Sequence, residues 1–593
     1  MKLFSEPGAG DRKPALTLLV FALLAALASQ VPSPWWEGSL LDIRPAFGRA
    51  GAGEEPPADT RPIEVPVVAI PAIEGTAPAP GDADPAVAAG EAPGDGTGAS
   101  GHLLAAAEVN ESSGSGDAVA ALGEGSGPAP QGSGAGEVVA SAAMPPAHDL
   151  PPGSGEALAQ AAVPGVWTAG LKGSAVPIAE LRALRPSIAA LVAALPPPDS
   201  PLETPCIDPA GAAATQPCRL RAMDRFFAKL TRTAARSATR PLRISQFGDS
   251  LVMGDDFTGE LRRLLQAQFG DGGHGFFYIG NPDRPYGAAE VGFGVSEEWT
   301  VRTVVAGGSS NPLYGLAGAA FVTNGSPTFN ASLRDGDRPV DRVGVLYHAR
   351  DTRGGFDVTG DGQRLARDLT VARGSSGIEW VDLGVEARRV RVSRFRGDWI
   401  FFGAVLEHSG PGVVVDNLGM VSGRIHQLMK IGERHWQQQI GARGTDLASF
   451  FFGVNDAAEG NGFAARSADY RAKYDGVLRR ARGALPDGDC LVISILTRGD
   501  RRDGRIVTYS SVGQIAAVQQ QSALAQGCGF WNAYAAIGGD EGARRWYDAS
   551  PRLLGGDLSH PTRTGYVRLG AMLYGTLASA YLAWIDRQIA GRP

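Results

Sequence analysis

The chain has 593 residues and a formal net charge of −7, from 55 Lys and Arg against 62 Asp and Glu. This balance argues against nucleic acid as the main partner, and four cysteines are too few for a disulfide-rich miniprotein or a multi-cysteine metal scaffold. The 81 Gly and 41 Pro make up about a fifth of the chain, well above average usage, so part of it is not packed core.

The first distinctive segment is an uncharged apolar run of 17 residues, 15–31, which follows three basic residues. This is the lower limit of length for a membrane-spanning helix. The basic flank and the two tryptophans at 35 and 36 favour an uncleaved anchor with its start in the cytoplasm. The alternative is a signal peptide cut after the Ala-Leu-Ala of 26–28. Both interpretations export the rest of the chain.

A long segment rich in Ala, Gly, Pro and Ser comes next. Within residues 51–165, 16 acidic side chains stand against one basic side chain, Arg61. The segment lacks the large apolar side chains needed to offset the entropy of an ordered chain. We therefore expect residues 33–165 to be a disordered, self-repelling, extended linker.

Strand-like and helix-like segments alternate in most of the remaining chain. A helix is expected over 178–195, where three prolines end it. A buried strand over 243–247 and an amphipathic helix over 257–269 follow. Further strands are expected at 413–416, 447–452, 491–496 and 530–534, and further helices at 425–440, 468–485, 512–526 and 562–589. This alternation predicts an α/β domain with a parallel, three-layer sheet.

Residues 291–410 do not show this alternation of strands and helices. They contain short β-like runs separated by Gly, Asp and Asn, such as 299–305 and 400–406. The spacing predicts a β-sandwich inserted between the first helix and the second strand of the α/β domain. Trp299 and Trp380 could stack on sugar rings, but a place in the core is favoured for both.

The first motif that carries chemistry is Gly248-Asp249-Ser250, directly after the 243–247 strand. A serine at a strand-to-helix turn exposes its hydroxyl at the carboxyl edge of the sheet, where open α/β sheets bind ligands. Its own N–H then faces an oxyanion formed there. Taken alone, the tripeptide also fits an ordinary turn with a serine cap. Asp249 is expected to anchor the turn.

The second motif is Gly453-Val454-Asn455-Asp456, after the 447–452 strand. The amide of Asn455 can donate a second hydrogen bond to the same oxyanion. Asp456 is expected to fix the loop rather than to act as a second catalytic acid. Between the two motifs lies the segment 417–423, where a glycine would let a backbone N–H approach the substrate closely.

The third motif is Asp557-Leu558-Ser559-His560, followed by Pro561. An Asp and a His three residues apart on one turn can meet side by side. The carboxylate of Asp557 would then hold Nδ1–H of His560 and leave Nε2 free to take the proton of Ser250. A capping turn before the last helix explains Asp557 and Pro561 but leaves His560 without a role.

Taken together, these motifs resemble those of the SGNH (GDSL-type) hydrolases, over about residues 241–290 and 411–590. The resemblance implies a flavodoxin-like sheet and cleavage of acyl esters without a metal or cofactor. The family's four blocks are carried by Ser250, a glycine in 419–423, Asn455 and His560.

The glycine block departs from the family's pattern. That block usually reads Asn-x-Gly-x-x-Gly, whereas three residues separate Gly419 from Gly423 here. The oxyanion donor of this block therefore stays open, with Gly423 preferred over Gly419. Residues 255–276, together with the β-rich insertion, are similar to the two-domain branch that includes bacterial peptidoglycan O-acetylesterases, whose inserted domain resembles carbohydrate-binding modules.

The cysteines form two predicted pairs. Cys206 and Cys218 flank a short Pro/Ala/Gly loop, and Cys490 and Cys528 lie at the same end of two strands that we expect to be neighbours. Two disulfides in an oxidising compartment are the favoured interpretation, and four unpaired thiols the alternative.

These observations predict a monomeric, exported serine esterase that removes O-acetyl groups from an acylated polysaccharide or peptidoglycan. It would lie on the periplasmic side of the cell envelope, or be secreted if the N-terminus is cut. The alternatives are a polysaccharide O-acyltransferase with the same triad and an inactive carbohydrate-binding protein. The expected organisation is a cytoplasmic flank 1–13, a membrane segment 14–32, the linker 33–165, a helical lead-in 166–240, the hydrolase domain 241–290 and 411–593, and the insertion 291–410.

Overall fold

A computed structural model describes residues 67–69, 176–207, 218–282, 286–306, 313–334, 336–457 and 462–591. The membrane segment predicted for 14–32 and most of the predicted linker lie outside these residues. Within them, no helix combines the length and the apolar character that a membrane crossing requires.

The central sheet has six strands in the order β1-β19-β16-β15-β2-β14. Five of them are parallel: β2 (Leu242–Gly248), β14 (Val413–Gly419), β15 (Leu447–Phe451), β16 (Asp489–Ile493) and β19 (Gly529–Trp531). Every residue of these strands is buried, which is why they read as nearly continuous apolar runs. The predicted parallel α/β sheet is confirmed.

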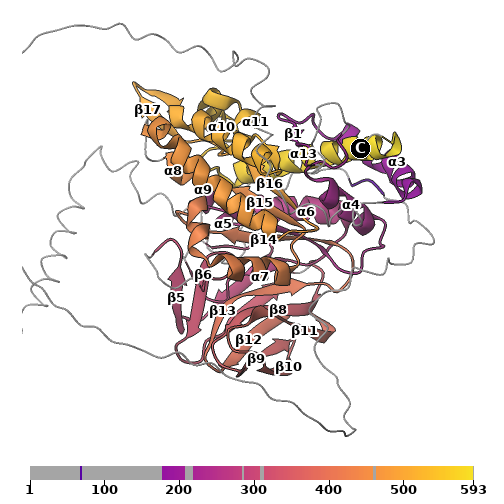
Figure 1. Ribbon diagram of the computed structural model, residues 1–593, viewed down its shortest axis with the longest axis vertical. Coiled ribbons are helices and arrows are strands. Elements are labelled where there is room, and N and C mark those ends of the chain that lie inside the picture. The colour runs from indigo at the N-terminus through magenta and orange to yellow at the C-terminus, as the bar shows by residue number, and fades with distance from the viewer. Residues whose placement is uncertain are drawn as a thin grey trace, which may run out of the picture. The chain divides into compact units, whose positions relative to one another are not determined.

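Helices cover both faces of this sheet (Figure 1). One face is packed by α7 (Glu433–Arg443), α9 (Phe463–Gly483) and α10 (Ser510–Ala525). The other is packed by α4 (Asp224–Ala234), α6 (Asp256–Phe269) and α13 (Arg563–Ile589). The three-layer arrangement brings the carboxyl ends of β2, β15 and β14 to one edge, because parallel strands end on the same side.

Two details differ from the sequence-based expectation. The helix expected over 425–440 is two elements, a 3-10 helix η4 (Ile425–Lys430) and α7, because Ile431 takes an extended conformation and Gly432 a non-helical one between them. The lead-in contributes more than helices: β1 (Leu202–Glu203) joins the sheet as an antiparallel edge strand beside β19. Helix α3 (Ile178–Ala194) packs along α13, so the lead-in is part of the α/β layer structure.

Residues 275–407 form two antiparallel sheets. One has the order β10-β9-β12-β7-β4, the other β11-β8-β13-β6-β5 with β3 also paired to β13. Their strands are β3 (Gly275–Phe277), β4 (Val291–Val295), β5 (Trp299–Thr303), β6 (Ala319–Thr323), β7 (Phe329–Leu333), β8 (Val340–Ala349), β9 (Arg353–Gly360), β10 (Gln363–Thr370), β11 (Ser376–Ala387), β12 (Arg389–Arg396) and β13 (Trp399–Glu407).

An aromatic core lies between the two sheets. Phe356 of β9 and Phe395 of β12 contact Phe401 of β13 across it. Trp299 is only 7% exposed and packs edge-on against Phe395, so the core role favoured for this tryptophan is confirmed. Trp380 lies under the guanidinium of Arg342, 4.4 Å from the ring centroid.

Buried charges join the sheets of 275–407 to the α/β layers. Arg243 of β2 and Arg443 of α7 both bind Glu407 of β13, at 2.9 and 2.6 Å, and Arg443 also binds Asp416 of β14 at 2.8 Å. All four side chains are almost fully buried. Burial alone would raise the pKa of Glu407, but the two guanidinium groups lower it to about 2.

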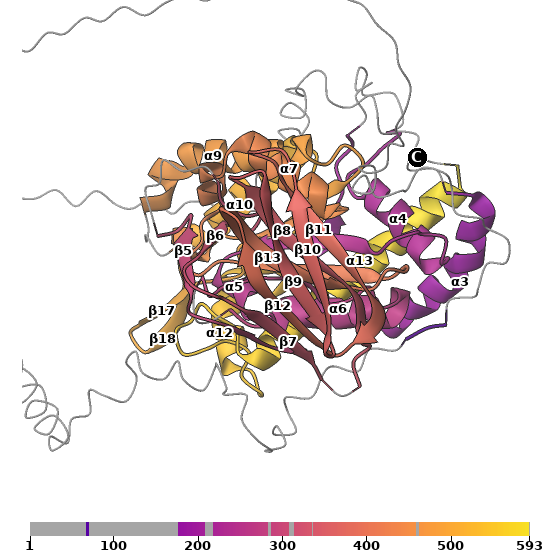
Figure 2. The ribbon, with the colours of Figure 1, turned by 90° about the horizontal axis from the view of Figure 1, so that it is seen from below.

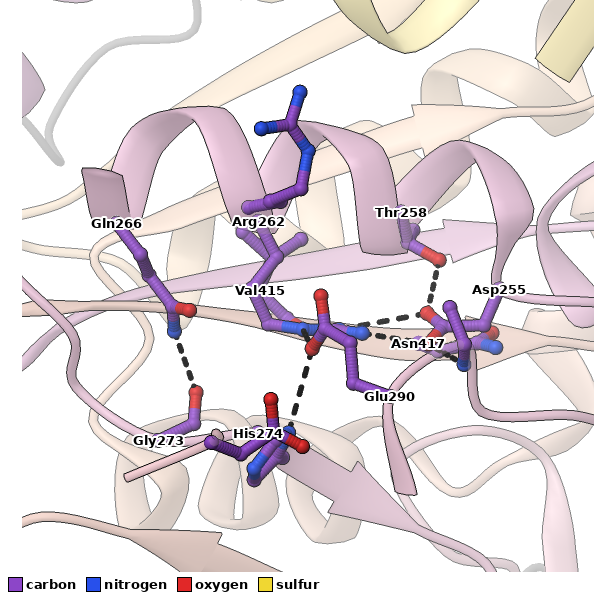
Figure 3. A network of polar contacts seen from close by, with 12 residues as sticks. Asp255, Thr258, Arg262, Gln266, Gly273, His274, Glu290, Val415 and Asn417 are labelled. Atoms are coloured by element: carbon purple, nitrogen blue, oxygen red, sulfur yellow. Dashed lines mark hydrogen bonds and ion pairs between the residues drawn. The ribbon is translucent and has the colours of Figure 1, made fainter. Parts of the chain in front are cut away.

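A second polar network fixes the start of α6 (Figure 3). Arg262 binds Asp255 at 2.5 Å and Glu290 at 3.0 Å, and also donates to the carbonyl of Val415 on β14. His274 lies 3.4 Å from Glu290. The network therefore joins α6 to Glu290, which precedes β4, and to β14, which follows the last strand of the β-rich segment.

A short piece of the predicted linker contacts the folded part. Val68 donates to Oε1 of Gln268 on α6 at 3.0 Å and accepts from its Nε2 at 2.7 Å. Val68 also packs against the core on that face of the sheet. The interpretation of 33–165 as one free extended linker is therefore corrected at 67–69, where the Gln268 amide satisfies both backbone groups of Val68.

Candidate active site

The nucleophile candidate lies at the turn between β2 and a short helix, α5 (Ser250–Met253). Asp249 caps this helix by accepting a hydrogen bond from the N–H of Leu251 at 3.0 Å. The first residue of a helix has no acceptor within the helix for its N–H. The N–H of Ser250 is thus available to an oxyanion formed at its own hydroxyl.

The three residues of the predicted triad are in contact. Oγ of Ser250 lies 2.7 Å from Nε2 of His560, and Nδ1 of His560 lies 2.5 Å from Oδ2 of Asp557. The other carboxylate oxygen of Asp557 accepts from the N–H groups of Ser559 and His560, at 3.1 Å each. These bonds hold the carboxylate so that the ring presents Nε2 to the serine.

The electrostatics of the pair favour a charged imidazole. The side chains of His560 and Asp557 are 41% and 52% exposed. Partial desolvation lowers the pKa of His560, but the hydrogen bond and the charge of Asp557 outweigh it and raise this pKa above 6.5. Desolvation likewise raises the pKa of Asp557, and the bonds from His560 outweigh it and hold this pKa below 3.8. The pair is therefore suited to accept the serine proton.

Asn455, in the short helix α8 (Val454–Ala457), lies at the end of the neighbouring strand β15. Its Nδ2 donates to the carbonyl of Gly423 at 2.9 Å. An amide carries two N–H donors, so this bond fixes the orientation of the group and leaves the second N–H for an oxyanion.

The two candidate glycines have other partners in this structure. The N–H of Gly423 donates to the carbonyl of Met420 at 3.2 Å, and the N–H of Gly419 donates to Oδ1 of Asn417 at 3.1 Å. Gly423 contributes its carbonyl, which holds Asn455. The assignment of an oxyanion N–H to Gly423 or Gly419 stays a prediction, and the geometry no longer favours Gly423.

The register of the glycine block is preserved in the backbone. Ser422 stands three residues after Gly419, where the motif has its second glycine, and it has a φ of +55°. This left-handed conformation is the one that favours glycine. The departure seen in the sequence is thus a Ser in a glycine-like conformation, not a longer turn.

Two buried carboxylates lie behind the triad. Asp249 is fully buried, and burial raises its pKa to about 7 although the Leu251 N–H acts in the opposite direction. Asp456 is 3% exposed and lies 4.0 Å from the guanidinium of Arg424. The charge of Asp249 adds to that of Asp557 in raising the pKa of His560. The structural roles expected for Asp249 and Asp456 stay predictions.

Sequence reasoning missed Arg498. It follows β16, its Nη1 donates to the carbonyl of Val454 at 3.4 Å, and its charge acts on His560. A basic residue five positions after the end of β16 was the available signal, because the carboxyl ends of all parallel strands share one edge.

Both predicted disulfides are present. The S–S distances are 2.06 Å for Cys206–Cys218 and 1.96 Å for Cys490–Cys528. The second joins β16 to the residue before β19, which are neighbours in the sheet as expected.

The comparisons with known proteins agree with this site. The model of the GDSL-like lipase/acylhydrolase family matches residues 374–568, which include Asn455, Asp557 and His560. A solved structure described as a peptidoglycan O-acetylesterase in action covers 60% of this chain and 96% of its own, with 22% identity and a TM-score of 0.52. None of the curated proteins matches the chain.

Two other solved structures are similar over less of the fold. An acetyl xylan esterase, AlAXEase, has 13% identity and a TM-score of 0.22, over 27% of this chain and 79% of its own. The salicylyl-acyltransferase SsfX3 from a tetracycline biosynthetic pathway has 13% identity and a TM-score of 0.24, over 49% of this chain and 96% of its own.

The predicted resemblance to the SGNH (GDSL-type) hydrolases is confirmed, and the α/β layers form an SGNH-type acylhydrolase fold.

Proposed function

We propose that this protein is an exported serine esterase that removes O-acetyl groups from a cell-wall or surface polysaccharide. The observation that carries the proposal is the contact chain from Ser250 through His560 to Asp557, at 2.7 and 2.5 Å. It supplies a nucleophile, its base and the group that orients the base. An inactive binding protein would have no need of these contacts.

The proposed reaction has two steps. His560 takes the Ser250 proton as Oγ attacks the ester carbonyl, and the oxyanion is held by the N–H of Ser250 and the amide of Asn455. His560 then gives the proton to the leaving sugar oxygen. Water, activated by the same imidazole, attacks the acyl-serine, and acetate leaves while Ser250 regains its proton.

Three observations support the choice of substrate and compartment. The structure described as a peptidoglycan O-acetylesterase aligns along nearly its whole length with a part of this chain as large as the α/β layers and the β-rich segment together. Two disulfides favour an oxidising compartment. The apolar run at 15–31 favours export, as anchor or signal peptide.

The test is acetate release from O-acetylated peptidoglycan and from an aryl acetate. Ser250→Ala is expected to reduce turnover of both roughly 10⁴-fold or more. Ser467→Ala, on the surface of α9, is the matched control and is expected to be as active as the wild type. Retained turnover in Ser250→Ala would refute the nucleophile, and transfer of acetyl to an added oligosaccharide without free acetate would favour the acyltransferase.

A further inference from the structure

A β-hairpin stands beside the catalytic loop and has no role in the reaction described above. Its strands are β17 (Gly499–Arg502) and β18 (Arg505–Thr508), next to helix α12 (Gly542–Asp548) (Figure 2). The N–H of Gly499 donates to the carbonyl of Leu558 at 2.8 Å, within the loop that carries Asp557 and His560. The hairpin is therefore fixed directly to the catalytic loop.

One face of the hairpin contacts α12, although Arg501 on this face is exposed. The guanidinium of Arg501 lies 4.7 Å from the ring centre of Tyr547 on α12, and Ile506, its partner across the ladder, packs against the core. Thr508 donates to the carbonyl of Asp540 at 2.6 Å. Successive side chains of a strand alternate between its two faces. The side chains at 500, 502, 505 and 507 therefore lie on the face opposite to Arg501 and Ile506.

The opposite face is exposed and carries an excess of positive charge. It presents Arg502 and Arg505, which pair across the ladder and are exposed, and the half-buried pair of Asp500 and Val507. Arg502 is 55% exposed and lies 3.6 Å from Asp500, and Arg505 is exposed at the turn. Asp503 lies exposed at the turn. Residues 498–508 thus contain four arginines against two aspartates, in a chain whose net charge is −7.

Arg498 extends this charge into the active site. It precedes β17 and pairs with the start of α10, since its carbonyl accepts from the N–H of Tyr509 at 2.8 Å. Its guanidinium donates to the carbonyl of Val454, next to Asn455. We define Arg498, Arg502 and Arg505 as the arginine strip, which begins at the oxyanion side of the site and continues outward along the hairpin.

We propose that the arginine strip is a subsite for carboxylate groups carried by the O-acetylated glycan, so that the enzyme prefers an anionic polymer to a neutral one. This rests on the proposed esterase function. Guanidinium groups bind carboxylates bidentately, and a row of exposed cations raises the local concentration of an anionic chain at the site. The arginine strip would not increase the affinity for a neutral acetylated glycan.

The test compares O-acetylated polygalacturonate with the same polymer after reduction of its carboxyl groups. The wild type is expected to favour the acidic form, and added salt to reduce the preference. Arg502→Gln with Arg505→Gln should raise KM for the acidic polymer roughly three- to tenfold, with kcat for an aryl acetate and KM for the reduced polymer unchanged. Arg502→Lys with Arg505→Lys, which keeps both positive charges, should retain the preference.

The matched control is Arg389→Gln with Arg391→Gln, two exposed arginines of β12 far along the chain from the triad. It is expected to behave as the wild type. Peptidoglycan with and without its stem peptides separates carboxylates on peptides from those on sugars. No preference in the wild type, an equal loss on both polymers, or the same loss in the β12 control would overturn the inference. Failure of the esterase proposal looks different, because no acetate is then released from any polymer.

Discussion

Acidification should destabilise this protein partly through one histidine, His435 of α7. Its Nε2 lies 3.0 Å from the carbonyl of Tyr314, and its Nδ1 lies 3.1 Å from Oγ of Ser376, which lies 2.7 Å from His348 on its other side. His435 is only 9% exposed. Burial first, and then the nearby His348, lower its pKa from 6.5 to about 4.

The size and the sign of this pH effect on the free energy of unfolding follow from the difference in proton binding between the folded and unfolded states. In the unfolded chain His435 takes up a proton near pH 6.5, whereas in the folded protein it does so only near pH 4. Between these values the unfolded state binds more protons, so the free energy of unfolding falls as the pH falls. The full difference is about 3 kcal/mol, from about 1.4 kcal/mol for each pKa unit. Above pH 6.5 this group contributes no pH dependence.

The assay is urea unfolding of the wild type and of His435→Gln at pH 7 and pH 4.5. The loss of stability on acidification should be about 2 kcal/mol smaller in the variant, because glutamine cannot be protonated. His102→Gln, in the predicted linker, is the control and should lose as much as the wild type. An identical loss in His435→Gln and the wild type would mean that folding does not lower the pKa of His435.

Three further predictions concern the triad, the oxyanion and the buried charges. Asp557→Asn should lower kcat roughly 10⁴-fold and move the acidic limb of the kcat/KM profile to lower pH, since Asp557 raises the pKa of His560. Asn455→Ala should lower kcat about 10²- to 10³-fold with a smaller change in KM in steady-state assays. Glu407→Gln should cost about 3 kcal/mol or more of unfolding free energy in urea, whereas Glu433→Gln, 55% exposed, should change it little.

Each of these would be contradicted by a specific result. For Asp557→Asn it is an unshifted acidic limb. For Asn455→Ala it is a kcat equal to that of the wild type with acetylated substrate. For Glu407→Gln it is a stability equal to that of Glu433→Gln, which would mean that the buried arginines do not depend on this carboxylate.

The sequence allowed the catalytic residues to be predicted because each follows a strand or precedes the last helix. Ser250 follows β2 and Asn455 follows β15, and parallel strands end on one edge. Asp557 and His560 are three residues apart, so their contact is local. The disulfide between Cys490 and Cys528 follows from the same order of strands.

The features that could not be predicted depend on contacts between residues distant in the sequence. Nothing in the local pattern of 202–203 indicates that β1 completes the sheet beside β19. The role of Gly423 depends on the position of Asn455 across the site, and the position of Arg498 depends on how the hairpin packs on α12. Local propensity also joined η4 and α7 into one helix, because a single glycine does not always end a helix.

The most direct test of the central claim is labelling with a serine-reactive fluorophosphonate, read by peptide mass spectrometry. One adduct is expected, on Ser250, and it should be lost in His560→Ala because the hydroxyl then has no base at 2.7 Å. An adduct on another serine, or equal labelling of Ser250 with and without His560, would contradict this expectation.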